Sequence, residues 1–282
     1  MDKTLKQIIK EKLQRLKSVP DAFLTQIEIV QKKAFTEILK LLGTIQVDEN
    51  GIILKGQLNK VEAIAAQLKN SMFNGDYIVY VRQFMSEFYK QKELTKSYFS
   101  AFGSFTDKDL YEQTFKASIN AAADLLNGNS VDTVLINDVK KILNSSMTTN
   151  TSYSDMILSL RNSIEGTDKA GKLYQYTNLY VRDAFAVADR SYTQIISDEI
   201  GYEWYLYSGG ELETSRDFCK ERHEQYYHIS EIQAWADLDW KGKNPATNAG
   251  NILVLVGGYN CIHSLLPVPT EDVPPEILAR IQ

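Results

Sequence analysis

Apolar side chains recur every three or four residues through most of the first two hundred positions. This spacing places them along one face of an α-helix. At the N-terminus it predicts two amphipathic helices, one on each side of Pro20. Further helices are predicted over residues 58–96, 107–126, 131–143, 154–163 and 168–199. We expect the first of these to break or kink at Gly75 and Asp76.

Proline is absent between Pro20 and Pro245. Because a proline inside a helix removes a backbone hydrogen bond and clashes with the preceding turn, its absence permits long uninterrupted helices. The last sixteen residues, in contrast, hold four of the six prolines.

Two stretches depart from the helical spacing. Residues 45–54 hold turn-forming residues between aliphatic ones, which predicts a short β-hairpin with a positive φ at Gly51. Residues 202–207 are largely aromatic and are followed by Ser208-Gly209-Gly210, which predicts a strand that ends in a turn.

These elements predict a mainly α protein in three parts. Residues 1–199 form a long-helix region that includes the short β-hairpin near 45–54. Residues 200–268, which hold all three tryptophans, form a small α+β domain. Residues 269–282 form an extended, proline-rich tail.

The composition is that of a soluble globular protein: 44% of the 282 residues are hydrophobic and 24% are charged. The formal charge of −5 gives no overall reason to expect nucleic-acid binding. The first twenty residues are nevertheless basic, with six lysines and arginines against Asp2 and Glu11. Such a run is most often a solvated helix face, and contact with nucleic acid or an acidic partner is the alternative.

No signal peptide and no membrane segment are expected. The start of the chain lacks a long apolar core with a cleavage site, and the longest aliphatic run covers only residues 252–256. Two cysteines without a secretion signal favour synthesis in a reducing cytoplasm.

Both cysteines and all three histidines lie between residues 219 and 263. Cys219 and His223 are four apart, so a helix would carry both on one face. Cys261 and His263 are two apart, so a strand would do the same. Together the two pairs would supply the four ligands of a tetrahedral structural zinc site. His228, nine residues after Cys219, is a rival to His223.

Other interpretations of these residues stay open. They could be ordinary buried cysteines with hydrogen-bonded histidines, or a catalytic Cys–His pair. With Asn260 and a metal ion they could also form a metal-dependent nuclease or toxin-like enzyme. Against that, residues 200–268 hold five basic side chains and nine acidic ones, a balance that would repel phosphate.

Two glycines and a charged pair flank the cysteines. Gly257 and Gly258 predict a tight turn that can bring Cys261 and His263 toward Cys219. Arg216 and Asp217 are expected to cap the helix that carries Cys219, with the carboxylate near its positive end.

Around these residues the chain resembles a known family. The matching positions are residues 214–219, Trp235, residues 240–242, residues 257–263 and Pro267. They resemble the C-terminal motif of bacteriophage minor head proteins, the head morphogenesis family similar to the phage Mu F protein and the SPP1 minor head protein. The most specific part is 257–263, which includes Asn260. Ile262 stands where the family commonly has arginine.

The resemblance implies a protein of the virion interior that is not an enzyme. Members lie inside the phage head near the portal, and act in capsid assembly and genome delivery after synthesis in the host cytoplasm. The expected partners are therefore the portal and major capsid proteins, with packaged DNA as a further contact for the basic N-terminus. A cellular helical interaction protein is a third interpretation.

Overall fold

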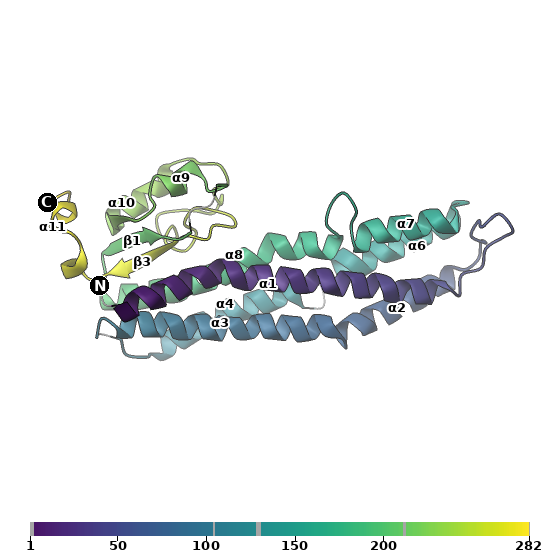
Figure 1. The fold of residues 1–282 in the computed structure, drawn as a ribbon, viewed down its shortest axis with the longest axis horizontal. Helices are drawn as coiled ribbons and strands as arrows, with labels where there is room; N and C mark the ends of the chain where they lie inside the picture. Colours follow the sequence, from purple (N-terminus) through teal and green to yellow (C-terminus); the bar gives the residue numbers. More distant parts are fainter. Residues whose placement is uncertain (1–2, 104, 128–130, 211–212, 282) are drawn as a thin grey trace. The chain divides into compact units, whose positions relative to one another are not determined.

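The computed structural model describes residues 3–103, 105–127, 131–210 and 213–281. It confirms a mainly α protein with a small antiparallel sheet near the C-terminus (Figure 1). The helices of the first two hundred residues are α1 (Lys3–Leu42), α2 (Leu58–Phe73), α3 (Asp76–Ser100), α4 (Asp109–Leu126), the π-helical turn η1 (Asp132–Ile136), α6 (Asn137–Thr148), α7 (Tyr153–Ile164) and α8 (Lys172–Ile200). The predicted break at Gly75 and Asp76 separates α2 from α3.

One prediction at the N-terminus is wrong, because α1 is a single helix that contains Pro20. Proline removes one hydrogen bond of the helix. Pro20 is itself buried, and Val19 and Phe23 beside it are both in the apolar core. Burial of this apolar face offsets the lost bond and keeps the helix continuous.

The chain divides into two compact units, and neither is a continuous stretch of sequence. The first consists of residues 1–20, 85–122 and 181–282, and the second of residues 21–84 and 123–180. Helices α1, α3, α4 and α8 therefore contribute residues to both units. Residues on both sides of the predicted boundary at 199/200 belong to the first unit.

The second unit contains the predicted hairpin. Val47 and Ile53 form an antiparallel bridge, and Gly51 has the expected positive φ of 74°. The turn is held by Asp48, whose carboxylate accepts hydrogen bonds from the Asn50 and Ile52 amides. Helix packing supplies the rest of this unit's core, including Phe23 stacked on Phe84.

A buried ion pair lies inside the first unit. Lys12 of α1 binds Asp189 of α8, and each side chain is only 1% exposed. Gln91 and Thr95 of α3 donate hydrogen bonds to the same Asp189 oxygen, and each bond is 3.1 Å long. Burial lowers the pKa of Lys12 from its usual value, and the neighbouring Asp189 carboxylate opposes that shift. Three helices thus share one polar centre in an apolar core.

The C-terminal part of the first unit holds the sheet. Its elements are β1 (Trp204–Ser208), α9 (Asp217–Lys220), β2 (Gln225–His228), α10 (Ile229–Ala234), the 3-10 turn η2 (Trp235–Asp237) and β3 (Ser264–Val268). β1 is the central strand, antiparallel to β2 on one side and to β3 on the other.

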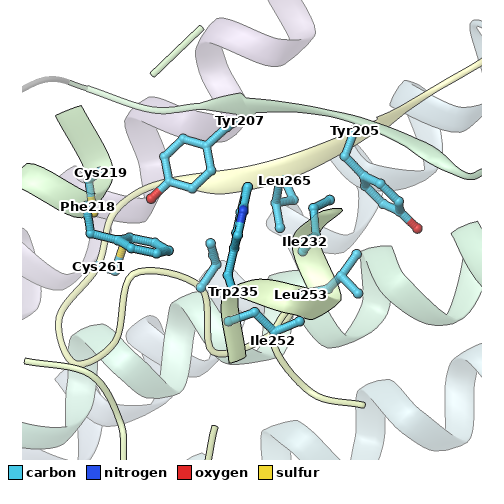
Figure 2. Close-up of a cluster of buried hydrophobic side chains, with 11 residues drawn as sticks. Tyr205, Tyr207, Phe218, Cys219, Ile232, Trp235, Ile252, Leu253, Cys261 and Leu265 are labelled. Carbon is cyan, nitrogen blue, oxygen red and sulfur yellow. The ribbon is translucent and has the colours of Figure 1, made fainter. Parts of the chain in front are cut away.

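Alternate side chains of β1 serve two apolar clusters, as expected for a strand covered on both faces. Tyr205 and Tyr207 join the larger cluster, which also holds Trp235 and both cysteines (Figure 2). Trp204 belongs to a smaller cluster with Val268 and Val273.

The C-terminal tail is partly helical, not extended as predicted. A 3-10 turn, η3, covers Thr270–Asp272, and a short helix, α11, covers Pro275–Leu278. Pro275 occupies the first turn of α11, where a proline is tolerated because no helix hydrogen bond is lost. None of the described helices is long and apolar enough to cross a membrane.

Candidate metal centre

Three of the predicted ligands come together in the first unit. One ligand atom from each of Cys219, Cys261 and His263 lies within 4.8 Å of the others, and all three residues are buried. The Cys261 sulfur and the His263 Nδ1 are 3.6 Å apart. Neither cysteine is in a disulfide. The group could hold a metal ion, because thiolates and imidazoles are the ligands that soft and borderline cations prefer.

His223 lies beside this group without belonging to it. Helix α9 ends at Lys220, so the expected helical face shared by Cys219 and His223 does not form. The chain then turns, with a positive φ of 54° at Glu224. The His223 ring nevertheless reaches the His263 ring, with centroids 5.9 Å apart. Its Nδ1 is buried and has no hydrogen-bond partner among the described residues.

His228 is engaged elsewhere. It precedes α10 as the N-cap residue, and its Nδ1 accepts a hydrogen bond from the Ser230 amide. The Glu231 carboxylate accepts a bond from the His228 amide in return, which completes a capping box. The ring packs edge-on against Trp204. The structure thus gives His228 a capping role, and does not place it with Cys219, Cys261 and His263.

The loop before β3 brings Cys261 and His263 to Cys219, and it depends on two glycines. Gly257 and Gly258 both have positive φ, as the predicted tight turn requires. A β-carbon on Gly257 would lie 2.3 Å from the Cys261 sulfur and 3.1 Å from the Cys219 sulfur. One on Gly258 would lie 2.0 Å from the Gly242 carbonyl oxygen. Only glycine leaves the space beside the sulfurs open.

Arg216 ties the two cysteine-bearing segments together. Its guanidinium donates to the carbonyl oxygens of Gly257 and Tyr259, at 3.0 and 2.5 Å. Trp240 donates its indole N–H to the same Gly257 oxygen. Arg216 is the N-cap residue of α9, but its side chain makes no capping bond, contrary to the prediction. Asp217 lies in the first turn of α9, where a carboxylate is favoured by the helix dipole.

Two residues of α8 also hold the loop before β3 in place, and the sequence did not single them out. The buried Arg190 donates to the carbonyl oxygens of Val254, Cys261 and His263. Asp183 accepts a hydrogen bond from the Asn260 amide. Asn260 itself has a positive φ of 56°, so its contribution here is a backbone one. An arginine and an aspartate seven residues apart on a helix are common, and nothing else in the sequence marks them.

The two sulfurs affect each other's pKa in opposite directions. The Cys219 thiol donates a hydrogen bond to Cys261, and this bond, assisted by His263 and Arg190, holds the pKa of Cys261 well below its usual value. The same bond, together with burial, raises the pKa of Cys219. A bound cation would favour the thiolate form of both cysteines, because metal ligands bind in their deprotonated form.

A cavity of about 920 Å³ adjoins the group. Cys219, Cys261 and His263 all line it. Its charged lining residues are Arg216, Asp217, Glu221, Arg222, Asp239 and Lys241. Basic and acidic side chains are equal in number here, so the cavity has no net preference for phosphate.

Comparisons of this chain with protein-family models, with curated proteins and with solved structures found no match.

Proposed function

We propose that the protein is a minor head protein of a bacteriophage, acting in head assembly, and that its Cys/His group binds a structural zinc ion. The observation that carries the proposal is the meeting of the two motif segments. Residues 214–219 and 257–263, which gave the resemblance, are in contact through the two sulfurs and through Arg216. The contact supplies a physical reason for two distant motifs to occur together.

The donor set supports zinc. Two cysteines and one histidine provide three of the four ligands typical of structural sites. His223 is the candidate for the fourth, since its ring is adjacent and its buried Nδ1 lacks a partner among the described residues. A bound ion would give that nitrogen the partner that a buried polar atom needs.

Metal analysis of the purified chain tests the zinc proposal. We expect about one zinc per chain, lost in Cys219→Ser and in Cys261→Ser. His228→Asn is the matched control, because asparagine preserves the N-cap of α10 and should keep the metal. A wild-type protein without stoichiometric zinc, whose melting a chelator leaves unchanged, would overturn the proposal.

The head role needs a test of its own. Particles produced from the genome that encodes this chain should contain it. Treatment of intact particles with protease should leave it whole, and opening the particles should expose it. Its gene should lie beside portal and terminase genes. Absence of the chain from purified particles would contradict the proposal.

The proposal also includes contact with packaged DNA, for which only some of the N-terminal lysines remain candidates. Lys12 and Arg15 of the basic N-terminal stretch bind Asp189 and Glu87. The exposed members among the described side chains are Lys6, Lys10 and Lys17. If they contact DNA, their combined replacement by glutamine should weaken DNA binding and reduce its dependence on salt.

A metal-dependent nuclease is the second candidate, and one observation favours it. Among the described residues only three candidate ligands come together, and they line a large cavity, as at a catalytic metal with an open position. Incubation with DNA and divalent metal tests this alternative. Cleavage that His263→Ala abolishes would support it over the structural role.

A further inference from the structure

We propose that Tyr207 positions the Cys219 thiolate in the metal centre by donating its hydroxyl hydrogen to that sulfur. This inference rests on the metal-binding part of the proposed function. It adds a residue that no sequence motif marks.

Tyr207 brings a buried hydroxyl into the sulfur cluster. The residue lies in β1 and is fully buried. Its ring lies 5.3 Å from the His263 ring, centroid to centroid. Figure 2 shows the hydroxyl directed toward the part of the core where Cys219 and Cys261 lie. Among the described residues, the hydroxyl has no partner that meets the usual distance and angle of a hydrogen bond.

This hydroxyl is not needed for packing. Phenylalanine would fill the same apolar space, whereas an unsatisfied buried hydroxyl destabilises the fold. The residue therefore carries a cost that only an acceptor would offset. A metal-bound thiolate is such an acceptor, because it keeps lone pairs and excess charge after it binds the cation.

The Tyr207 hydroxyl interacts with the Cys219 side chain. A hydrogen-bond donor of this kind orients the ligand that it contacts and tunes the bound metal. An O–H···S bond would in addition fix the side-chain rotamer of Cys219 toward the ion.

The neighbouring Tyr205 provides a matched control. It occupies the same strand and the same apolar cluster, two residues away. Its hydroxyl, however, bonds the Ser197 hydroxyl at 2.9 Å. Figure 2 shows it directed away from the sulfurs. Removal of either hydroxyl is the same chemical change in the same strand, and only one of the two should affect the metal.

The experiment compares Tyr207→Phe with Tyr205→Phe in the full chain. Zinc affinity is measured by competition with a chromophoric chelator, and the thiolate-to-metal absorption band is measured after cobalt loading. We expect Tyr207→Phe to weaken zinc binding about 10-fold or more and to shift the cobalt band. Tyr205→Phe should change neither.

The possible outcomes distinguish failure of this inference from failure of the metal-binding proposal on which it rests. If wild-type protein gives no thiolate–cobalt band, the metal centre itself fails. If wild type binds metal and Tyr207→Phe binds it with the same affinity and spectrum, only the role of Tyr207 fails. If Tyr207→Phe does not fold, the test uses Tyr205→Phe, which keeps the Tyr207 hydroxyl. Zinc loading of that variant must perturb a buried tyrosine in the near-ultraviolet difference spectrum. Absence of that signal overturns the inference.

Discussion

Gly257 is the residue at which the backbone and the candidate metal centre constrain each other most closely. Its positive φ of 70° disfavours any side chain, and a β-carbon would overlap the Cys261 sulfur. Gly51 in the hairpin has a similar φ of 74°, yet nothing lies within 4 Å of its β-carbon position. A comparison of Gly257 with Gly51 therefore separates the effect of backbone strain from that of steric overlap.

We predict that Gly257→Ala destabilises the protein more than Gly51→Ala does. The hairpin variant should cost about 1 kcal/mol, the cost of a left-handed alanine. Gly257→Ala should add about 1 to 3 kcal/mol of overpacking and should also lose zinc. Urea unfolding of both variants measures the difference. Equal losses would show that the sulfurs move aside without cost.

Tyr205 makes the first unit sensitive to alkali. Burial raises the pKa of Tyr205 to about 12, against the opposing effect of the bond to Ser197. The unfolded chain loses the same proton near pH 10. The stabilising contribution is therefore complete below pH 10 and is lost as the pH rises through about 12.

The expected result is a free energy of unfolding that falls between pH 10 and 12. The contribution of Tyr205 amounts to about 2 to 3 kcal/mol. Tyr205→Phe should flatten this fall, and Tyr259→Phe, at an exposed position, should not. Urea titrations at a series of pH values provide the measurement. A fall of the same size in Tyr205→Phe would assign the alkaline sensitivity to other groups.

At the residue scale the sequence predicted the candidate ligands better than the residues that support them. Cys219, Cys261 and His263 were selected by residue type, and they meet in space. Arg190 and Asp183 could not be selected, because arginine and aspartate are common and act here through tertiary contacts with a loop far along the chain.

Among the elements, α1, α3 and α8 share the buried ion pair of Lys12 and Asp189. A buried pair is weak evidence for stability, because both charges lose their hydration. Removal of one partner is more damaging than removal of both, since it leaves a charge without compensation in the core.

We therefore predict that Lys12→Met costs about 3 to 5 kcal/mol in the free energy of unfolding. The double variant Lys12→Met, Asp189→Leu should recover most of that loss. A double-mutant cycle by chemical denaturation measures the coupling. If the double variant is as unstable as the two single losses added together, the charges are not coupled.

Most helix positions were predictable at this scale. The helix predicted over 131–143 is instead the π-helical turn η1 followed by α6, which continues to Thr148. The apolar spacing gave α2, α3, α4, α7 and α8 to within a few residues of their observed ends. It did not predict that α1 continues through Pro20, because the decisive term is burial of the flanking residues against other helices. The length of α9 was overestimated for a similar reason: the turn at Glu224 continues into β2, which pairs with β1.

At the scale of the whole molecule, we expect metal binding to stabilise the first unit alone. The candidate ligands and their supports, Arg190 and Arg216, all belong to the first unit. Binding to the folded state stabilises the structure that holds the ligands in place.

We predict that zinc removal raises amide hydrogen exchange in residues 217–223 and 257–268. Exchange in α2, α6 and α7, which belong to the second unit, should stay the same. Hydrogen-exchange mass spectrometry with and without a chelator makes the comparison. A uniform rise across both units would mean that metal binding controls global unfolding instead.

The division into two units was beyond sequence analysis. Patterns of apolar residues report local structure, whereas the units join stretches from opposite ends of the chain. A boundary drawn at residue 200 follows the change from helices to strands. It cannot indicate that residues 1–20 pack with residues 181–282.

The ion pair of the first unit also sets an order of events during synthesis. Lys12 leaves the ribosome long before its partner, because Asp189 follows 177 residues later. At about 5 to 20 residues per second, the lysine waits about 9 to 35 seconds for its carboxylate. During that time the N-terminal turns of α1 have an apolar face without its final neighbours. The nascent chain therefore needs either a temporary cover for this segment or a late, concerted closure of the first unit.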